Sequence, residues 1–351
     1  MNKKISYMLS LLLAGTLFTS CKNGDAEFPD YEEGTTVYFA YQYPVRTIVL
    51  GDDEYDVTLD HAHKCQIKAT FGGSYNGSNG SVTVAVDPTL CDNLTFEDGT
   101  PVKVMPKEFY ELSPTTLPFN GTMNGTAEVQ LTDEFFKNAD AVKNTYVIPL
   151  VIVDQTGFGK VLSGTLKEGG SPVRTDASQW EILPMDYVLY CVKFQNKYSG
   201  YWLTNGNSSI DNIEKAQTVQ IKTKSLNQSI YTVSYQRKYQ ARTKDENGNE
   251  VAKWEDRILK VQMQLTFDEA GNCSITSLTP GYTTNGGGLW TEKGAKKSWG
   301  NKDRDLMELN YTIDFGVDDY GNHIEGATGN EKLVWQRSGV VREEFAPIYT
   351  K

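Results

Sequence analysis

Short runs rich in β-branched and aromatic residues recur along almost the whole chain, separated by clusters of glycine and asparagine. In most runs apolar and polar residues alternate, which places successive side chains on opposite faces of a strand. Short strands joined by Gly/Asn turns are typical of antiparallel sandwiches and barrels. The sequence therefore predicts an all-β protein, with strands at 35–42, 65–71, 81–86, 101–105, 126–131, 145–153, 187–195, 218–224, 229–236, 257–267, 272–278, 306–315 and 331–337.

One short helix is expected among the strands, at 132–142. Thr132 can cap its amino terminus, and Asp133 and Glu134 carry negative charge that favours the first turn of a helix.

Three segments share the pattern of an aspartate followed by Gly-Asn, at 245–249, 268–272 and 318–322. Aspartate can open a turn, and Gly and Asn tolerate positive φ, so each segment is expected to close a hairpin. None has the alternating oxygen ligands and terminal Glu of an EF-hand loop, so calcium sites are not expected.

The alternation lapses once, into Gly, Ser, Pro and charge, at 167–180. Such a change is typical of a domain boundary. We therefore expect an immunoglobulin-like β-sandwich at 35–167, a linker at 168–180 and a second domain at 181–351. Long strands joined by hairpins favour an antiparallel lipocalin-like (calycin) β-barrel for the second domain, with a jelly-roll lectin-like sandwich as the alternative.

The first residues have the layout of a secretory signal: two lysines, an apolar run from Ile5 to Phe18, and small residues before Cys21. This layout resembles a bacterial lipobox, so we expect 1–20 to be a lipoprotein signal peptide and Cys21 the site of lipid attachment. An ordinary signal peptide with an incidental Cys21 is the alternative.

The acidic, Gly/Pro-bearing segment 21–34 is expected to be a flexible stalk. Its residues 22–27 loosely resemble the signal that sends such lipoproteins to the cell surface, so we expect a lipid-anchored outer-membrane protein. Retention on the inner face stays open. No later run approaches the ~18 apolar residues of a transmembrane helix, so lipid would be the only anchor.

The formal charge of the chain is −11, and it becomes −13 without residues 1–20, which contain Lys3 and Lys4. An acidic chain argues against nucleic acid and anionic membrane surfaces as partners, because both need basic patches. Three histidines leave little for histidine-based catalysis, and no phosphate-binding glycine loop is present. We expect no cofactor and no metal.

Four cysteines follow the stalk: Cys65, Cys91, Cys191 and Cys273. An envelope location permits disulfides, of which Cys65–Cys91 and Cys191–Cys273 are the simplest within-domain pairings. Buried free thiols are the alternative.

Three segments, at 28–51, 131–138 and 146–157, resemble the immunoglobulin-like N-terminal domain of Bacteroidota surface lipoproteins, a domain of unknown function. The segments 196–203, 296–314 and 330–339 resemble a companion domain, also of unknown function. The resemblance implies a polysaccharide-utilisation locus and an outer-membrane transporter nearby. It carries over no catalytic residues.

The Gly-rich, locally basic segment 280–305 carries Tyr282, Trp290 and Trp299. Flat aromatic faces bind the C–H faces of sugars while polar side chains bind the hydroxyls, so these residues are candidates for glycan binding. Trp202 and Trp254 are candidates for the same site. The alternative is that these rings fill the core of a barrel.

These features favour a non-catalytic cell-surface lipoprotein that binds a glycan or glycoconjugate. A structural subunit docking against a transporter is the alternative hypothesis, and a glycoside hydrolase is a further one. Hydrolysis would need two carboxylates facing each other across the scissile bond, and no such motif is recognisable.

Overall fold

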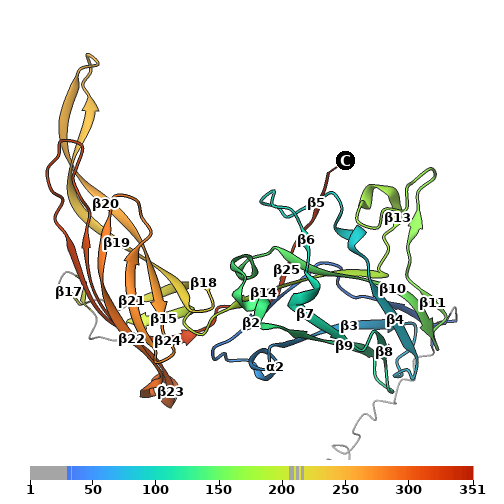
Figure 1. Cartoon of the computed structure of the whole chain (residues 1–351). Coiled ribbons are helices and arrows are strands. Elements are labelled where there is room, and N and C mark those ends of the chain that lie inside the picture. Colours follow the sequence, from blue (N-terminus) through green and yellow to red (C-terminus); the bar gives the residue numbers. More distant parts are fainter. Residues whose placement is uncertain (1–29, 33, 205–208, 211–212, 215–216, 351) are drawn as a thin grey trace, which may run out of the picture.

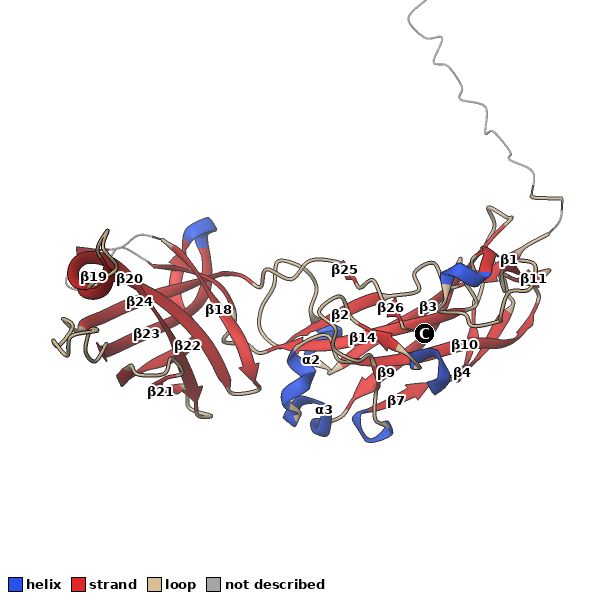
Figure 2. Cartoon of the chain, turned by 90° about the horizontal axis from the view of Figure 1, so that it is seen from above, coloured by secondary structure: helices blue, strands red, loops and turns tan. Residues whose placement is uncertain are grey.

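The computed structural model describes residues 30–32, 34–204, 209–210, 213–214 and 217–350. These residues form two β lobes that lie end to end (Figures 1 and 2). One lobe is a sandwich, and the other is a barrel from which a long hairpin, β19–β20, projects. The expected all-β class with a sandwich and an antiparallel barrel is confirmed.

The sandwich consists of a five-stranded and a seven-stranded sheet. The five-stranded sheet has the order β11 (Lys160–Val161), β1 (Thr36–Tyr38), β3 (Lys64–Gly72), β9 (Asn124–Leu131) and β7 (Tyr110–Ser113). The seven-stranded sheet contains β25 (Glu343–Glu344), β2 (Pro44–Val49), β14 (Tyr187–Gln195), β10 (Tyr146–Thr156), β4 (Ser81–Val86), β8 (Thr116–Pro118) and β6 (Lys103–Val104). Two small pairs are β12 (Thr165–Leu166) with β13 (Trp180–Ile182), and β26 (Ile348–Tyr349) with β5 (Leu94–Thr95).

The central strand β14 is buried on both faces, which accounts for its nearly continuous apolar sequence. Val188, Val192 and their alternate neighbours pack between the two sheets. Leu189 and Cys191 pack on the opposite face, in a second core that also contains Phe345. β14 is parallel to β2 and antiparallel to β10.

The barrel is inserted into the sandwich rather than following it. β14 belongs to the seven-stranded sheet, and after the barrel the chain returns so that β25 pairs with β2 and β26 with β5. The expected boundary at 168–180 is therefore wrong: those residues connect elements of the sandwich, and the barrel domain begins after β14. The error arose because an apolar strand buried on both faces has the same sequence character in either domain.

Eight antiparallel strands form the barrel, and it closes because β15 pairs with both β18 and β24. Closure excludes the jelly-roll alternative. The strands are β15 (Gly200–Thr204), β18 (Thr218–Ser225), β19 (Gln228–Lys244), β20 (Glu250–Phe267), β21 (Asn272–Ser277), β22 (Thr283–Ser298), β23 (Lys302–Asp314) and β24 (Ala327–Arg337). β16 (Ser209–Ile210) and β17 (Ile213–Glu214) extend the same sheet.

Helices are few and short among the described residues: α2 (Thr58–His61), α3 (Asp133–Lys137) and 3-10 turns at Pro88–Cys91, Lys107–Phe109, Ala139–Val142, Ala177–Gln179 and Trp299–Asn301. The helix expected at 132–142 thus divides into α3 and a 3-10 turn. Thr132 precedes α3, but its hydroxyl donates to the Glu108 carbonyl oxygen instead of capping the helix.

The three Asp…Gly-Asn turns have one geometry, and the hairpin prediction for them is confirmed. In each, the aspartate N–H donates to the asparagine carbonyl four residues on, at 2.9–3.0 Å, and the glycine has φ between 82° and 86°. The aspartate carboxylate accepts the asparagine backbone N–H at 2.8–2.9 Å. Positive φ is the reason that glycine occupies the fourth position.

Candidate functional site

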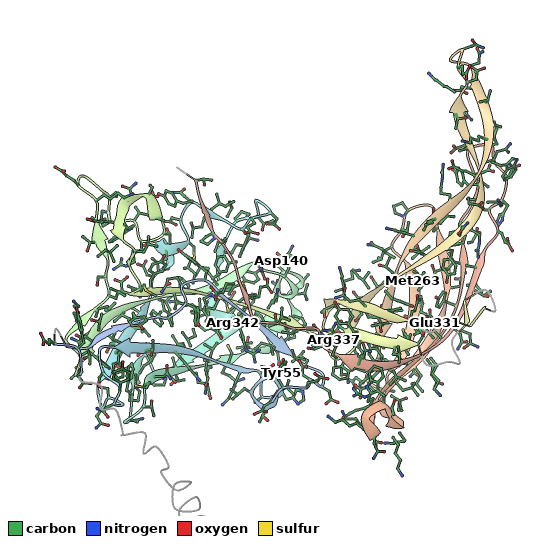
Figure 3. The ribbon with its side chains drawn as sticks, turned by 180° about the vertical axis from the view of Figure 1, so that it is seen from behind. Tyr55, Asp140, Met263, Glu331, Arg337 and Arg342 are labelled. Carbon is green, nitrogen blue, oxygen red and sulfur yellow. The ribbon has the colours of Figure 1, made fainter. Side chains whose placement is uncertain are left out.

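The chain crosses between the two lobes twice, at Asn196–Ser199 and at Ser338–Arg342, because the barrel is an insertion. Figure 3 labels Arg337, the last residue of β24, where the barrel meets the sandwich. Two connections restrict the relative motion of the lobes more than a single linker would.

Asn196 anchors the first crossing and is 1% exposed. Its amide nitrogen donates to the carbonyl oxygens of Ser225 and Gln228, at 2.8 and 2.9 Å. Its amide oxygen accepts from the Ser199 hydroxyl at 2.7 Å. The side chain therefore ties the crossing to the turn between β18 and β19.

Polar contacts fasten the second crossing and the neighbouring hairpin to the sandwich. The Ser338 hydroxyl donates to Asp53 at 2.5 Å, and Lys293 forms an ion pair with Asp52. Lys193 donates to Glu343 at 2.6 Å. Burial opposes ionisation of Glu343, but hydrogen bonds from Lys193 and Asn144 outweigh it and lower the pKa of the carboxyl.

A groove of about 720 Å³ lies at this junction, and both lobes contribute to its walls. This volume is in the range of small-molecule sites, which often occur between domains. We call it the junction groove; its lining residues are Leu50, Phe136, Lys137, Lys197, Tyr198, Ser225, Leu226, Asn227, Phe267, Asp268 and Glu269.

The barrel side of the junction groove carries a group of packed aromatic rings. Tyr198 stacks on Phe267 with centroids 3.8 Å apart and planes 7° apart, and Trp290 meets Tyr198 edge-on at 5.3 Å. The ammonium of Lys197 lies 4.4 Å from the Trp290 centroid and 5.3 Å from that of Tyr198. This cation–π contact places a positive charge at the edge of an apolar surface.

The junction groove combines apolar and hydrogen-bonding groups. Within the described residues the Tyr198 hydroxyl makes no hydrogen bond, so it can donate to or accept from a ligand. Burial raises the pKa of Tyr198, which keeps the phenol neutral at physiological pH. Asn272 hydrogen-bonds the Asp268 carboxylate and lowers its pKa, which keeps that group ionised.

A second, smaller cleft of about 320 Å³ lies at the same junction, among Lys193, Gln220, Lys222, Thr223 and Glu343. Its side chains are mostly polar, and Lys193 and Glu343 already pair with each other there. The junction groove is larger and has the aromatic wall, so it is the better candidate for ligand binding.

The five aromatic candidates from the sequence do not meet on one surface. Trp202 is fully buried, and Trp290 is 8% exposed with an indole N–H that has no partner among the described residues. Tyr282 packs on Phe315, with centroids 5.3 Å apart. Both tryptophans thus belong to the barrel core, as in the alternative interpretation, and only Trp290 approaches the junction groove.

The two remaining tryptophans lie elsewhere on the barrel. Trp254 is 58% exposed, on the projecting β19–β20 hairpin. Trp299 is half-buried at the turn between β22 and β23, and the Arg304 guanidinium lies 5.0 Å from its ring centroid.

Sequence reasoning missed Phe136, Lys197 and Tyr198, which lie at the junction groove. Phe136 is in the expected helix, and the other two follow the strand at 187–195. The segment of Lys197 and Tyr198 was noted only for its family resemblance, and nothing local indicated that residues about 60 positions apart would form one groove.

The two possible disulfides are absent, and the alternative of buried free thiols holds. Cys65, Cys91, Cys191 and Cys273 are all free and buried. Cys191 lies in the sandwich and Cys273 in the barrel, while Cys65 and Cys91 belong to separate cores. Cys21 and the stalk up to residue 29 lie outside the described residues.

Two further findings concern the described part of the chain. It contains no group of three or more His, Cys, Asp or Glu side chains placed to hold a metal ion. None of its helices has the length and apolar character needed to cross a membrane.

Comparison with solved structures identifies a relative over nearly the whole chain. A Bacteroides ovatus protein of unknown function is 33% identical, with a TM-score of 0.72, and the match covers 92% of this chain and 100% of that one. This chain belongs to the same family. A Bacteroidota family of unknown function was expected from the sequence, and that part of the expectation is confirmed.

One family model has nearly the bounds of the inserted barrel, and the other covers the sandwich up to β10. The domain of unknown function DUF5627 matches residues 197–339, which correspond to the inserted barrel, and a model described as an N-terminal domain matches residues 31–159. No curated protein matches the chain.

Two other solved structures from Bacteroides ovatus are more distant. One, a multidomain protein including DUF1735, is 11% identical with a TM-score of 0.37, over 87% of this chain and 96% of that one. The other, described as a candidate carbohydrate-binding protein, is 14% identical with a TM-score of 0.28, over 85% and 80%.

Proposed function

We propose that this family member is a non-catalytic binding protein that holds a glycan or glycoconjugate in the junction groove. The observation that carries the proposal is the composition of that groove: an aromatic wall around Tyr198, bordered by ammonium, carboxylate and amide groups.

This composition suits a sugar because a sugar ring has apolar C–H faces and several hydroxyls. The C–H faces pack on apolar surface, here provided mainly by Leu226, which is 45% exposed, and by the small exposed parts of Tyr198 and Phe136, which are 4% and 3% exposed. Hydroxyls both donate and accept hydrogen bonds, and the groove has both kinds of partner in Lys197 and Asp268. A groove with both signs of charge favours a neutral polar ligand over a strongly anionic one.

The cellular setting of the proposal comes from the sequence. Cys21 would carry the lipid at the outer membrane, the stalk would extend from it, and the sandwich would act as a spacer. Weak sugar contacts gain from multivalency at a surface, so a tethered binder can concentrate a glycan for a neighbouring transporter.

The test uses residues 22–351, which contain every described residue, on a broad glycan array and then by calorimetry. Tyr198→Phe removes only a hydroxyl that has no partner among the described residues, so it should weaken binding without lowering the melting temperature. Tyr320→Phe is the matched control, because Tyr320 is 42% exposed in the turn 318–322 of the barrel. Absence of binding to any glycan, or binding that Tyr198→Phe leaves unchanged, would contradict the proposal.

A further inference from the structure

The hairpin β19–β20 extends well beyond the body of the barrel (Figures 1 and 3). We call its projecting part, residues 234–260, the arm. The two strands pair without any shift in register from Gln228↔Thr266 to Lys244↔Glu250. The neighbours β18 and β21 pair only near the base, up to Tyr231 and from Met263. A two-stranded ribbon has two edges, and in the arm these two edges have different surroundings.

The β19 edge of the arm is covered by the loop that joins β23 to β24. Asp318 accepts the backbone N–H of Gln240 at 3.3 Å, and Asp319 accepts that of Arg242 at 2.9 Å. Lower on the same edge, the Arg237 guanidinium donates to the carbonyl oxygens of Gln236 and Gly326, both at 2.9 Å.

The β20 edge has no such cover among the described residues. At the base, Gln262 directs its N–H to Thr279 and its C=O to Leu278, both away from β19. Because backbone groups alternate along a strand, the even-numbered residues from Ala252 to Lys260 direct theirs to the same side. These groups have no hydrogen-bond partner in the described part of the chain. An open edge of this kind is a template for another strand.

The side chains of this edge strand are amphipathic. Trp254 and Ile258 are 58% and 66% exposed and lie on one face, separated by Asp256, which pairs with Lys238 at 2.9 Å. The opposite face carries Glu255 and Arg257, joined by an ion pair of 2.7 Å. Exposed large apolar side chains beside an open edge mark an interaction surface.

We propose that the open edge of β20 pairs with the same edge of a second copy of this chain, antiparallel about a two-fold axis through Asp256. This register places each Trp254 beside Ile258 of the other copy, so all four exposed apolar side chains cover one another. It also places each Glu255 beside Arg257 of the other copy. An isologous contact of this kind closes at two subunits.

The charges of the strand favour this register over a shift by one residue pair. Moving the axis to residue 255 would oppose Glu255 to itself and Lys253 to Arg257, and like charges in opposed positions are destabilising. With the axis at Asp256, Lys253 and Lys260 fall opposite Leu259 and Ala252. The two Asp256 carboxylates do meet, but each already has Lys238 as its counterion.

The test is the mass of residues 22–351 by sedimentation equilibrium, at chain concentrations up to about 0.1 mM. We expect a reversible dimer. In the Arg257→Glu variant, Glu255 of each copy lies beside the introduced glutamate of the other copy. This repulsion occurs twice in the dimer and should raise the dimer Kd about tenfold. The double variant Glu255→Arg with Arg257→Glu restores both cross-pairs and should return the Kd to that of the parent. A monomer at every concentration, or a double variant as weak as the single one, would overturn the proposal.

The register is tested separately by oxidative cross-linking. Asp256→Cys should form a disulfide-linked dimer, because residue 256 lies opposite residue 256 of the other copy. Ala252→Cys should not form one. The four described native cysteines are buried and provide a clean background. Cross-linking at 252 and not at 256 would contradict the assigned axis. Tyr198→Phe should leave dimerisation unchanged, so this proposal can fail independently of the glycan proposal.

Discussion

The Tyr311 hydroxyl lies 2.5 Å from Oε1 of Glu331 and donates a hydrogen bond to it inside the barrel (Figure 3 labels Glu331). Tyr231 donates to the other carboxylate oxygen at 2.7 Å, and the hydroxyls of Tyr235 and Tyr311 are 3.1 Å apart. Glu331 is 1% exposed. Burial raises the pKa of Glu331, and the two tyrosine hydrogen bonds oppose the rise without cancelling it.

This raised pKa predicts how barrel stability depends on pH. A carboxyl whose pKa is higher in the folded state binds more protons when folded. Its contribution is therefore fully present below the ordinary glutamate pKa of 4.5 and is lost as the pH rises through the folded value. Glu331→Gln should remove this dependence from urea unfolding curves measured across that range. Glu308→Gln, on the outer face of the same barrel, is the control. Equal pH profiles for Glu331→Gln and the parent would contradict the prediction.

Removing the Glu331 carboxyl altogether should be more damaging. Glu331→Ala leaves the buried Tyr231 hydroxyl without an acceptor, leaves the Tyr311 hydroxyl only that of Tyr235, and empties the space of the carboxyl; an unpaired buried group costs roughly 1–3 kcal/mol. We expect a loss of about 3 kcal/mol in the free energy of unfolding. A change below about 1 kcal/mol would mean that the network is not formed as described.

Two turns of identical pattern give a matched pair of glycine substitutions. Gly248 and Gly271 have φ values of 82° and 86°, so alanine is strained at both by about 1 kcal/mol. A Cβ at 248 meets nothing within 4 Å, whereas one at 271 would lie 2.3 Å from the Trp290 carbonyl oxygen. Gly271→Ala should therefore lower stability clearly more than Gly248→Ala in chemical unfolding. Equal losses of stability would show that the backbone at Trp290 moves away from the added methyl group without an energetic cost.

Trp290, which is buried, and Trp254, which is exposed, predict opposite outcomes. Trp290→Ala removes a core side chain and should cost about 3–5 kcal/mol, whereas exposed Trp254→Ala should change stability by less than about 0.5 kcal/mol. Thermal unfolding at concentrations below the dimer Kd checks both. A stable Trp290→Ala protein would reassign Trp290 from the core to the surface of the junction groove.

The four buried thiols should be unreactive in the folded protein. Burial raises the pKa of Cys65, Cys91, Cys191 and Cys273 to about 12 each. The thiolate is the reactive form, so at pH 8 these thiols should react with a thiol reagent only as fast as the chain unfolds. Four equivalents should react at once in denaturant. Rapid labelling of the native chain 22–351 would contradict their burial.

Local features of the fold could be predicted from the sequence because they depend on neighbouring residues. Alternation identified most strands, and Asp…Gly-Asn identified the turns, since the aspartate and asparagine that bond lie only four residues apart. The insertion of the barrel could not be predicted in this way. It depends on pairing Glu343–Glu344 with Pro44–Val45, about 300 residues apart, in two residues with no strand signal.

For the candidate site, the sequence predicted that aromatic residues would take part, but not which ones. A tryptophan on an alternating strand can face the core or the solvent, and the choice depends on the register of the entire barrel. Thus Trp202 and Trp290 proved to be core residues. Tyr198, which follows an apolar strand, is 4% exposed and belongs to the same core, and it also borders the junction groove. A groove between an inserted domain and its host has no sequence pattern of its own.

The central claim is that the junction groove binds a glycan through Tyr198. The most direct measurement is a calorimetric titration of the best array glycan into the parent chain, Tyr198→Phe and Tyr320→Phe. One lost hydrogen bond of about 1 kcal/mol predicts binding about fivefold weaker for Tyr198→Phe and unchanged for Tyr320→Phe. Equal affinity for all three proteins, or no binding by the parent, would contradict the account.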